Sequence, residues 1–217
     1  MPRHGLGLDT AVDRKLAWGV AAVPLAGEST SGDLHVVREF RGGVLVAVID
    51  ALGHGADASR AAHLAAETLA AHADEEPREI LLRCNRVLRA TRGVVMSLAS
   101  INWADNRMTW IGVGDVAGVL VAAARPGGTT NFETALLTRG GIVGTSDELA
   151  ARPWVIPLTA GDTLIFATDG IRPDFTSQGS TGRAPQQIAD DLLRRFQKGT
   201  DDALVLVARY PGAGGAR

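Results

Sequence analysis

The chain has a single cysteine, almost no net charge and no long apolar run. Cys84 is the only cysteine among 217 residues, so no intrachain disulfide can form and a reducing, cytoplasmic location is expected. The formal net charge of −2 gives no electrostatic footprint for nucleic acid or for an anionic membrane. No stretch reaches the roughly 18 apolar residues of a membrane-spanning helix, and the first residues have no apolar core typical of a signal peptide. The sequence therefore predicts a cytoplasmic protein without nucleic-acid or membrane partners.

Signatures of several common enzyme classes are also missing. The chain has no Walker nucleotide-binding pattern and no G-x-S-x-G nucleophile elbow. Gly53, Gly55 and Ala58 fit G-x-G-x-x-A, but a dinucleotide site also needs a second parallel strand that ends in an acid about 20 residues on. Here a second predicted helix follows instead. Cys84 lies in a predicted helix with no glycine-rich loop after it, so it is interpreted as a buried structural thiol rather than a nucleophile.

The chain does contain a series of short apolar runs joined by glycine-rich or polar turns. These runs predict strands at residues 16–24, 34–40, 44–50, 94–102, 107–113, 116–124, 131–137, 154–158, 162–168 and 203–210. Helices are predicted at 56–72, 77–90 and 185–196. Because the strands do not alternate singly with helices, the pattern favours an α+β fold of stacked antiparallel sheets with helices outside. Residues 1–15 are expected to form a flexible leader, 16–210 a single domain and 211–217 a disordered tail.

Three of the predicted strands carry an aspartate at one end. Asp50 and Asp169 each close a buried apolar run, and Asp201 opens the final run. If the last strand lies antiparallel to the other two, its beginning shares a sheet edge with their ends, and the three carboxylates meet. Buried carboxylates are costly unless a positive group meets them. The sequence therefore predicts a divalent cation site, and an all-oxygen ligand set favours Mg²⁺ or Mn²⁺ over zinc.

Two further acids and one histidine are weaker candidates. Asp33 and Asp115 each follow a glycine in a predicted turn, where an ordinary Asx turn accounts for an aspartate equally well. His54 stands between two glycines, and a structural role in the turn is more typical there than a ligand role. Two cations bridged by Asp50 would lower the pKa of a bound water and orient a phosphoryl group for in-line attack. This arrangement favours phosphate-ester hydrolysis.

The ordered set of motifs resembles the metal-dependent serine/threonine phosphatases of the protein phosphatase 2C class (PPM). "IDALGHG" resembles the family's Asp-x-x-Gly-His-Gly element, "ATDGI" its Thr-Asp-Gly motif, and "TDDALVLVARY" its terminal acidic strand motif. "TSGD" and "GVGD" resemble two Gly-Asp elements of the family. "ATRGVVMSLASI" and "RGGIVG" are similar to the bacterial sporulation and stressosome branch. The resemblance extends over residues 16–210.

The resemblance implies a four-layer α-β-β-α sandwich and a particular ligand set. Asp50, Asp169 and Asp201 would be the catalytic metal ligands for two Mn²⁺ or Mg²⁺ ions, with Asp50 bridging them. The metal site would also include the Ala51 carbonyl, Asp33 and, for an accessory third ion, Asp115. The implied substrate is a phosphorylated regulatory protein of the stressosome or anti-sigma-antagonist type, dephosphorylated in the cytoplasm by a monomer or weak dimer.

The chain departs from the larger family members in two respects. Those members hold the substrate phosphate with an arginine near the N-terminus; here Arg3, Arg14 or neither could serve. No extended flap insertion is evident after Gly144. The alternative function is a catalytically inactive scaffold or binding module in a signalling complex. Retention of all three acids favours the enzyme, because a scaffold does not need them.

Overall fold

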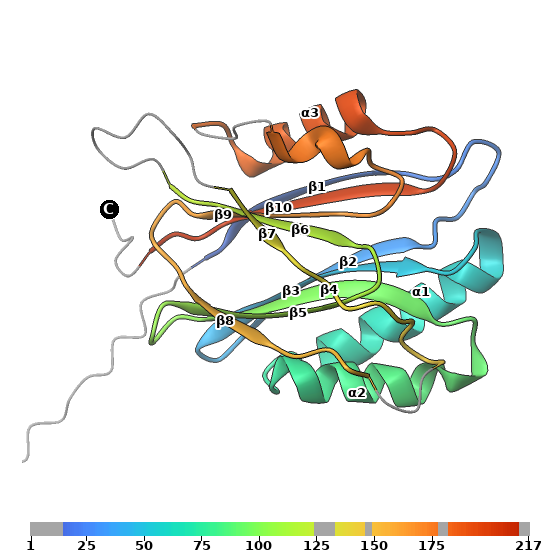
Figure 1. Ribbon diagram of the computed structural model, residues 1–217, viewed down its shortest axis with the longest axis horizontal. Coiled ribbons are helices and arrows are strands. Elements are labelled where there is room, and N and C mark those ends of the chain that lie inside the picture. Colours follow the sequence, from blue (N-terminus) through green and yellow to red (C-terminus); the bar gives the residue numbers. More distant parts are fainter. Residues whose placement is uncertain (1–14, 124–132, 146–148, 178–181, 213–217) are drawn as a thin grey trace, which may run out of the picture.

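Two five-stranded antiparallel sheets lie face to face in the computed structural model, with helices on both outer faces (Figure 1). The structure describes residues 15–123, 133–145, 149–177 and 182–212. Its strands are β1 (Ala17–Val23), β2 (Asp33–Phe40), β3 (Gly43–Ala51), β4 (Val94–Asn102), β5 (Arg107–Val113), β6 (Ala117–Val121), β7 (Glu133–Leu136), β8 (Trp154–Pro157), β9 (Thr163–Ala167) and β10 (Ala203–Arg209). Its helices are α1 (Gly55–Ala71), α2 (Pro77–Val87) and α3 (Pro185–Phe196), with short 3₁₀ helices η1 (Leu88–Ala90) and η2 (Pro173–Ser177).

The sheet topology confirms the predicted sandwich. One sheet has the strand order β1-β10-β9-β6-β7 and the other β2-β3-β4-β5-β8. All paired neighbours are antiparallel. Helices α1 and α2 cover the second sheet, and α3 covers the first (Figure 1). The predicted elements are present with ends shifted by a few residues. The short helix η2 was not predicted. Residues 1–14, 124, 131–132 and 213–217, which belong to the predicted leader, two predicted strands and the tail, lie outside the described residues.

Strand β3 shows why an apolar run becomes a central strand. Side chains alternate between the two faces of a strand. Val44, Val46 and Val48 pack between the sheets, whereas Leu45, Ala47 and Ile49 pack under the helices. All six are fully buried. A strand covered on both faces needs apolar residues at successive positions, which explains the uninterrupted run before Asp50.

Small side chains bring α1 close to the sheet, and larger ones anchor α3. Helix α1 turns Ala58, Ala61, Ala62, Ala65 and Leu69 inward. Helix α3 buries Ile188, Ala189, Leu192 and Phe196 against β1 and β10.

Cys84 is buried on α2, as predicted, and burial raises the pKa of its thiol to about 12. In the part of the chain that the structure describes, no helix is long and apolar enough to cross a bilayer.

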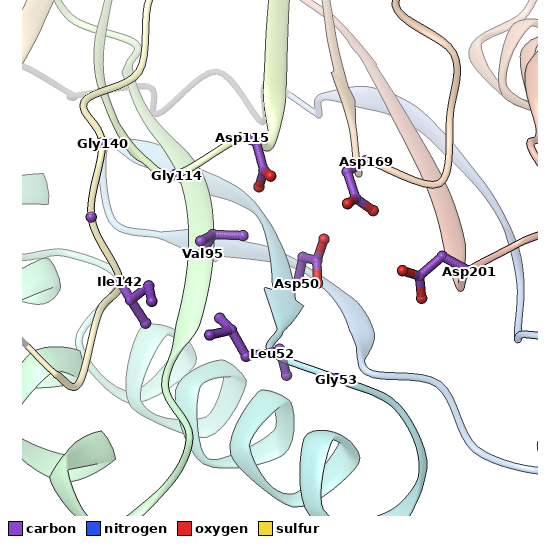
Figure 2. A pocket seen from close by; sticks show the side chains of 12 residues that line it. Asp50, Leu52, Gly53, Val95, Gly114, Asp115, Gly140, Ile142, Asp169 and Asp201 are labelled. Carbon is purple, nitrogen blue, oxygen red and sulfur yellow. The ribbon is translucent and has the colours of Figure 1, made fainter.

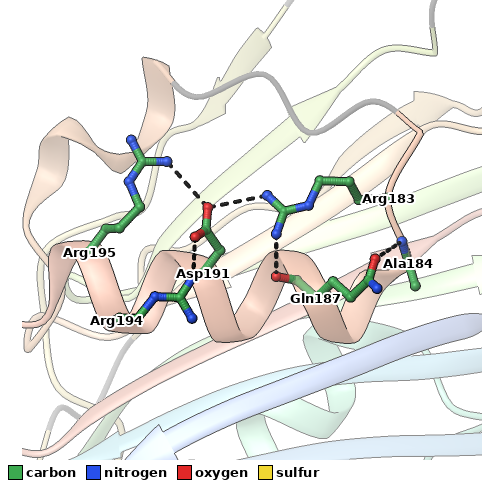
Figure 3. Close-up of polar contacts among 6 residues, drawn as sticks. All are labelled: Arg183, Ala184, Gln187, Asp191, Arg194 and Arg195. Atoms are coloured by element: carbon green, nitrogen blue, oxygen red, sulfur yellow. Dashed lines mark hydrogen bonds and ion pairs between the residues drawn. The ribbon is translucent and has the colours of Figure 1, made fainter.

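On its exposed face, α3 carries a cluster of ion pairs around Asp191 (Figure 3). The carboxylate of Asp191 accepts hydrogen bonds from Arg183, Arg194 and Arg195. Arg183 also donates to the carbonyl of Gln187 at 3.0 Å, which ties the chain before the helix to its first turn. These arginines are about half exposed or more, so the pairs stabilise the fold only modestly.

The strand register brings several strand ends to one end of the sandwich. In the second sheet, Asp50 near the end of β3 pairs with Asp33 at the start of β2. In the first sheet, Ala167 at the end of β9 pairs with Val205 of β10 and with Ala117 of β6. The ends of β3 and β9 therefore meet the beginnings of β2, β6 and β10, as the sequence predicted for β10.

Candidate metal centre

A pocket of about 530 Å³ opens at this end of the sandwich. Its lining includes four aspartates from four different loops or strand ends: Asp50, Asp115, Asp169 and Asp201. Figure 2 shows their carboxylates facing a common space. Ala51, whose carbonyl was predicted to be a ligand, also lines the pocket. The structure thus brings together five of the six predicted site residues.

Asp33, the sixth, lies beside Asp50 but lines no part of the pocket. Its side chain is 3% exposed and accepts a hydrogen bond of 2.7 Å from the hydroxyl of Thr168. That hydroxyl in turn accepts a hydrogen bond of 2.9 Å from the N–H of Leu204. Asp33 therefore joins the starts of β2 and β10 to the end of β9, on the strand next to Asp50.

The two adjacent acids at the start of β10 have different surroundings. Asp201 is exposed and lines the pocket. Asp202 is 3% exposed, and its carboxylate accepts hydrogen bonds of 2.7 Å from the backbone N–H groups of Leu25 and Gly32. Asp202 is thus fully used in holding the loop between β1 and β2, which leaves Asp201 for the pocket.

Gly170 allows β9 and β10 to meet closely behind Asp169. A Cβ at Gly170 would lie 1.9 Å from the carbonyl oxygen of Asp202, so no larger residue fits without backbone movement. Close packing therefore explains why the Thr-Asp-Gly motif has a glycine at this position. It fixes the distance between the strand ends that carry Asp169 and Asp201.

The loop after β3 turns sharply at the pocket. Gly53 has a φ of +84°, a conformation that other residues adopt only at a cost. A Cβ there would lie 2.8 Å from Nη1 of Arg92, so this guanidinium lies against the loop. Arg92 is also 4.0 Å from the carboxylate of Asp57. His54 points to Glu28, with 2.8 Å between Nδ1 and Oε1, and it does not line the pocket.

Burial and mutual repulsion raise the pKa values of the carboxyl groups in and beside the pocket. Burial, followed by the charges of Asp33, Asp169, Asp115 and Asp201, raises the pKa of Asp50 to about 9. Burial is also the main cause that raises the pKa of Asp33 to about 7, although the Thr168 hydrogen bond acts in the opposite direction. The pKa of Asp169 is raised by burial and by Asp201 and Asp115, and is lowered by Lys198. Without a bound cation, ionising this cluster is costly.

The donor set fits hard divalent cations. Among the described residues, the charged side chains that line the pocket are all aspartates, and carboxylate oxygens are ligands that Mg²⁺ and Mn²⁺ prefer. Among the described residues, no three acidic, histidine or cysteine side chains converge tightly enough to form a closed cage for one ion. A spread arrangement suits Mg²⁺, which keeps several waters and binds through one or two carboxylates.

Two features of the pocket were not found from the sequence. Arg92 and Lys198 bring positive charge to its rim, and no motif spacing indicated either of them. Leu52, Val95 and Ile142 line its other side, and no sequence pattern indicated them. Arg3 and Arg14, considered as phosphate-binding residues, lie outside the described residues.

Comparison with known proteins places the chain in a family. The sequence model of the stage II sporulation protein E (SpoIIE) family matches residues 41–211, which is most of the chain. The chain belongs to the SpoIIE family. This family consists of PP2C-type phosphatases, so the predicted family is confirmed. The predicted enzyme class, a phosphoprotein phosphatase that hydrolyses phosphoric monoesters, is confirmed as well.

One relative, RsbX, resembles this SpoIIE-family chain in both sequence and fold. The phosphoserine phosphatase RsbX of Bacillus subtilis (strain 168) is 24% identical over 184 residues, which is 84% of this chain and 89% of RsbX. A crystal structure of RsbX in complex with magnesium superposes with a TM-score of 0.76 at 23% identity, covering 88% of this chain and 93% of that one.

A second solved relative is the PP2C phosphatase domain of SpoIIE from Bacillus subtilis. That structure, which includes a fragment of the regulatory domain, has a TM-score of 0.71 at 22% identity, covering 91% of this chain and 64% of that one. A serine/threonine phosphatase PstP structure in complex with two manganese ions has a TM-score of 0.68 at 19% identity, covering 90% and 98%. At these identities the structural comparisons establish the fold.

Proposed function

We propose that this chain is a Mn²⁺- or Mg²⁺-dependent serine/threonine protein phosphatase that acts on a phosphorylated regulatory protein in bacterial stress signalling. The observation that carries the proposal is the set of four aspartates around one pocket, with Asp50 half-buried between them. Fold maintenance alone gives no reason for this arrangement, because it destabilises the metal-free protein. Binding of divalent cations would offset the repulsion.

Each pocket residue has a role in this proposal. Asp50 lies centrally and would hold both ions, and Asp169 and Asp201 would be further ligands from the side of the other sheet. The Ala51 carbonyl adds a neutral oxygen, and Asp115 is placed for an accessory third ion. When bound, such cations supply an activated water and neutralise charge on the phosphoryl oxygens. Asp33 keeps Asp50 in position through the β2–β3 pairing.

Arg92 is the proposed contact for the substrate phosphate. Its guanidinium lies against Gly53 at the pocket, and its ion pair with Asp57 is long at 4.0 Å. Arginine forms bidentate hydrogen bonds with phosphate oxygens. Releasing Arg92 from an exposed and loosely paired partner costs little, since such pairs contribute about 0–1 kcal/mol.

The relatives support the substrate class. RsbX bears the name of a phosphoserine phosphatase. Another solved structure shares the fold with a TM-score of 0.80 at 24% identity. It is described as the bacterial stressosome, a modular system adapted to control secondary messenger signalling. It covers 90% of this chain and 100% of that one. We infer a cytoplasmic enzyme, monomeric or weakly dimeric, whose substrate is a phosphoserine or phosphothreonine protein.

The test is Mn²⁺-dependent hydrolysis of phosphoserine and phosphothreonine peptides by the purified protein. Turnover should require millimolar Mn²⁺ or Mg²⁺ and should stop in excess chelator. Asp105→Asn, in the exposed turn between β4 and β5, serves as the matched control for substitutions in the pocket. If the protein binds phosphopeptides without hydrolysing them at any metal concentration, the scaffold function is correct and the enzyme proposal is wrong.

A further inference from the structure

The pocket that holds the four aspartates also has an apolar side. Leu52, Val95 and Ile142 line it, and Figure 2 shows their side chains grouped apart from the carboxylates. Leu52 and Ile142 are partly exposed, while packing against the core between the sheets. Gly140 and Gly141 form the adjacent wall. One continuous pocket therefore has an acidic side and an apolar side.

The apolar side is built on a braced backbone. The N–H of Gly114 donates to the carbonyl of Arg139 at 2.8 Å, which holds the start of the segment that carries Ile142. Val94 and Val143 exchange two backbone hydrogen bonds of 3.0 and 2.8 Å, which hold its end. Both anchors belong to the second sheet or its turns, so this wall is preformed before any ligand binds.

We propose that this apolar side is a specificity subsite that receives an aliphatic side chain adjacent to the phosphorylated residue of the substrate protein. The inference rests on the phosphatase function proposed above and names the sequence context that the same pocket selects. The occupant is a leucine-sized side chain next to phosphoserine or phosphothreonine, entering beside the phosphate.

Volume and charge support this occupant. A pocket of about 530 Å³ is as large as sites that enclose a complete small ligand, so a phosphoryl group on a short side chain leaves much of it unfilled. An acidic neighbour of the phosphate would lose its hydration against Leu52 and Ile142 and be disfavoured. An aliphatic neighbour would bury against Leu52 and Ile142. Such remote contacts supply binding energy that positions the phosphate.

The test uses three phosphoserine peptides that differ only at the residue after phosphoserine, which is leucine, serine or aspartate. With Mn²⁺ present, kcat/KM should be about tenfold or more higher for the leucine peptide than for the serine peptide, a typical discrimination for an apolar pocket. The aspartate peptide should be the poorest substrate. The same series with leucine before phosphoserine identifies the side from which the chain enters.

Two variants examine the subsite directly. Ile142→Ala removes part of the apolar wall and should reduce the leucine preference severalfold. Gly140→Val adds a branched side chain to the pocket wall next to the apolar side: a Cβ at Gly140 meets nothing within 4 Å, and its φ lies outside the left-handed region, so the protein should fold normally. The leucine preference should then fall to nearly one. Leu137→Ser, at a side chain 76% exposed and outside the pocket, is the matched control and should keep the preference.

The outcomes separate the subsite from the phosphatase function. Equal kcat/KM for the leucine and serine peptides in both series would overturn the subsite and leave the phosphatase intact. So would a leucine preference that survives both Ile142→Ala and Gly140→Val. Manganese should raise the melting temperature of all three variants as it does for the wild type, which shows that the ion site is unaffected. Failure to hydrolyse any peptide with Mn²⁺ would refute the phosphatase and the subsite together.

Discussion

Raising the pH should destabilise the metal-free protein because of the aspartates around Asp50. Burial and neighbouring carboxylates raise the pKa of Asp50 to about 9 and that of Asp33 to about 7, from 3.8. The stability that these groups contribute is complete below their unfolded pKa, and it is lost as the pH rises through the folded values. Each additional proton held by the native state lowers the unfolding free energy by about 1.4 kcal/mol per pH unit. One to two such protons give a decline of about 1.4–2.7 kcal/mol per pH unit from pH 5 to 6.5.

Asp50→Asn isolates this effect. The substitution removes one titrating carboxylate, so the slope should decrease by about 1.4 kcal/mol per pH unit, and the metal-free variant should be more stable than the wild type at pH 7.5. Other titrating groups are common to both proteins, including His35, whose pKa is lowered by burial. Millimolar Mn²⁺ should stabilise the wild type by mass action and have little effect on the variant.

Urea denaturation followed by circular dichroism, in chelator at several pH values between 5 and 8, measures these slopes. The difference between the two proteins decides the outcome. If the unfolding free energies of the wild type and Asp50→Asn have the same dependence on pH, the pKa of Asp50 is not raised in the folded protein as its burial in the pocket implies. Asp50 then needs no cation to offset its charge.

Four other outcomes are expected. Asp169→Asn should lower kcat, measured by steady-state kinetics, by at least about a hundredfold because a metal ligand is lost, while the protein stays folded. The control Asp105→Asn should leave kcat unchanged. Arg92→Ala should raise KM for phosphopeptides about tenfold, whereas Arg60→Ala, which removes the other arginine paired with Asp57, should not. Gly170→Ala should lower the melting temperature by several degrees because its Cβ would collide with a backbone carbonyl. Finally, phosphotyrosine peptides should be turned over poorly beside matched phosphoserine peptides, because the longer ring holds phosphorus away from an ion site positioned for short side chains.

The fold was predictable because its strands obey a simple pattern. Strand β3 is apolar at every buried position up to Ile49, and its first polar residue, Asp50, stands at the pocket. The same reasoning applies to the end of β9. Antiparallel pairing then brings Asp201 to the same end of the sandwich, which needs only the direction of β10. These inferences depend on local pattern and strand direction, and both can be read from sequence.

The remaining parts of the site depend on contacts between distant segments. Arg92 lies against Gly53 at the edge of the pocket because the turn before β4 packs against the loop after β3, and no motif spacing predicts that packing. Leu52, Val95 and Ile142 come from three separate segments whose side chains meet only in the folded chain. Asp33 is buried where it accepts a hydrogen bond from Thr168, which belongs to the other sheet's side of the sandwich. Such relations are determined by tertiary packing.

Anomalous diffraction from crystals grown with Mn²⁺ tests the central claim most directly. The claim is that Asp50 organises a two-ion centre in the pocket between the sheet ends. Two anomalous peaks should appear in that pocket, both coordinated by the Asp50 carboxylate, with Asp169 and Asp201 among the other ligands. An occupied site elsewhere, or no peak in the pocket of a preparation that hydrolyses phosphopeptides, would contradict the claim.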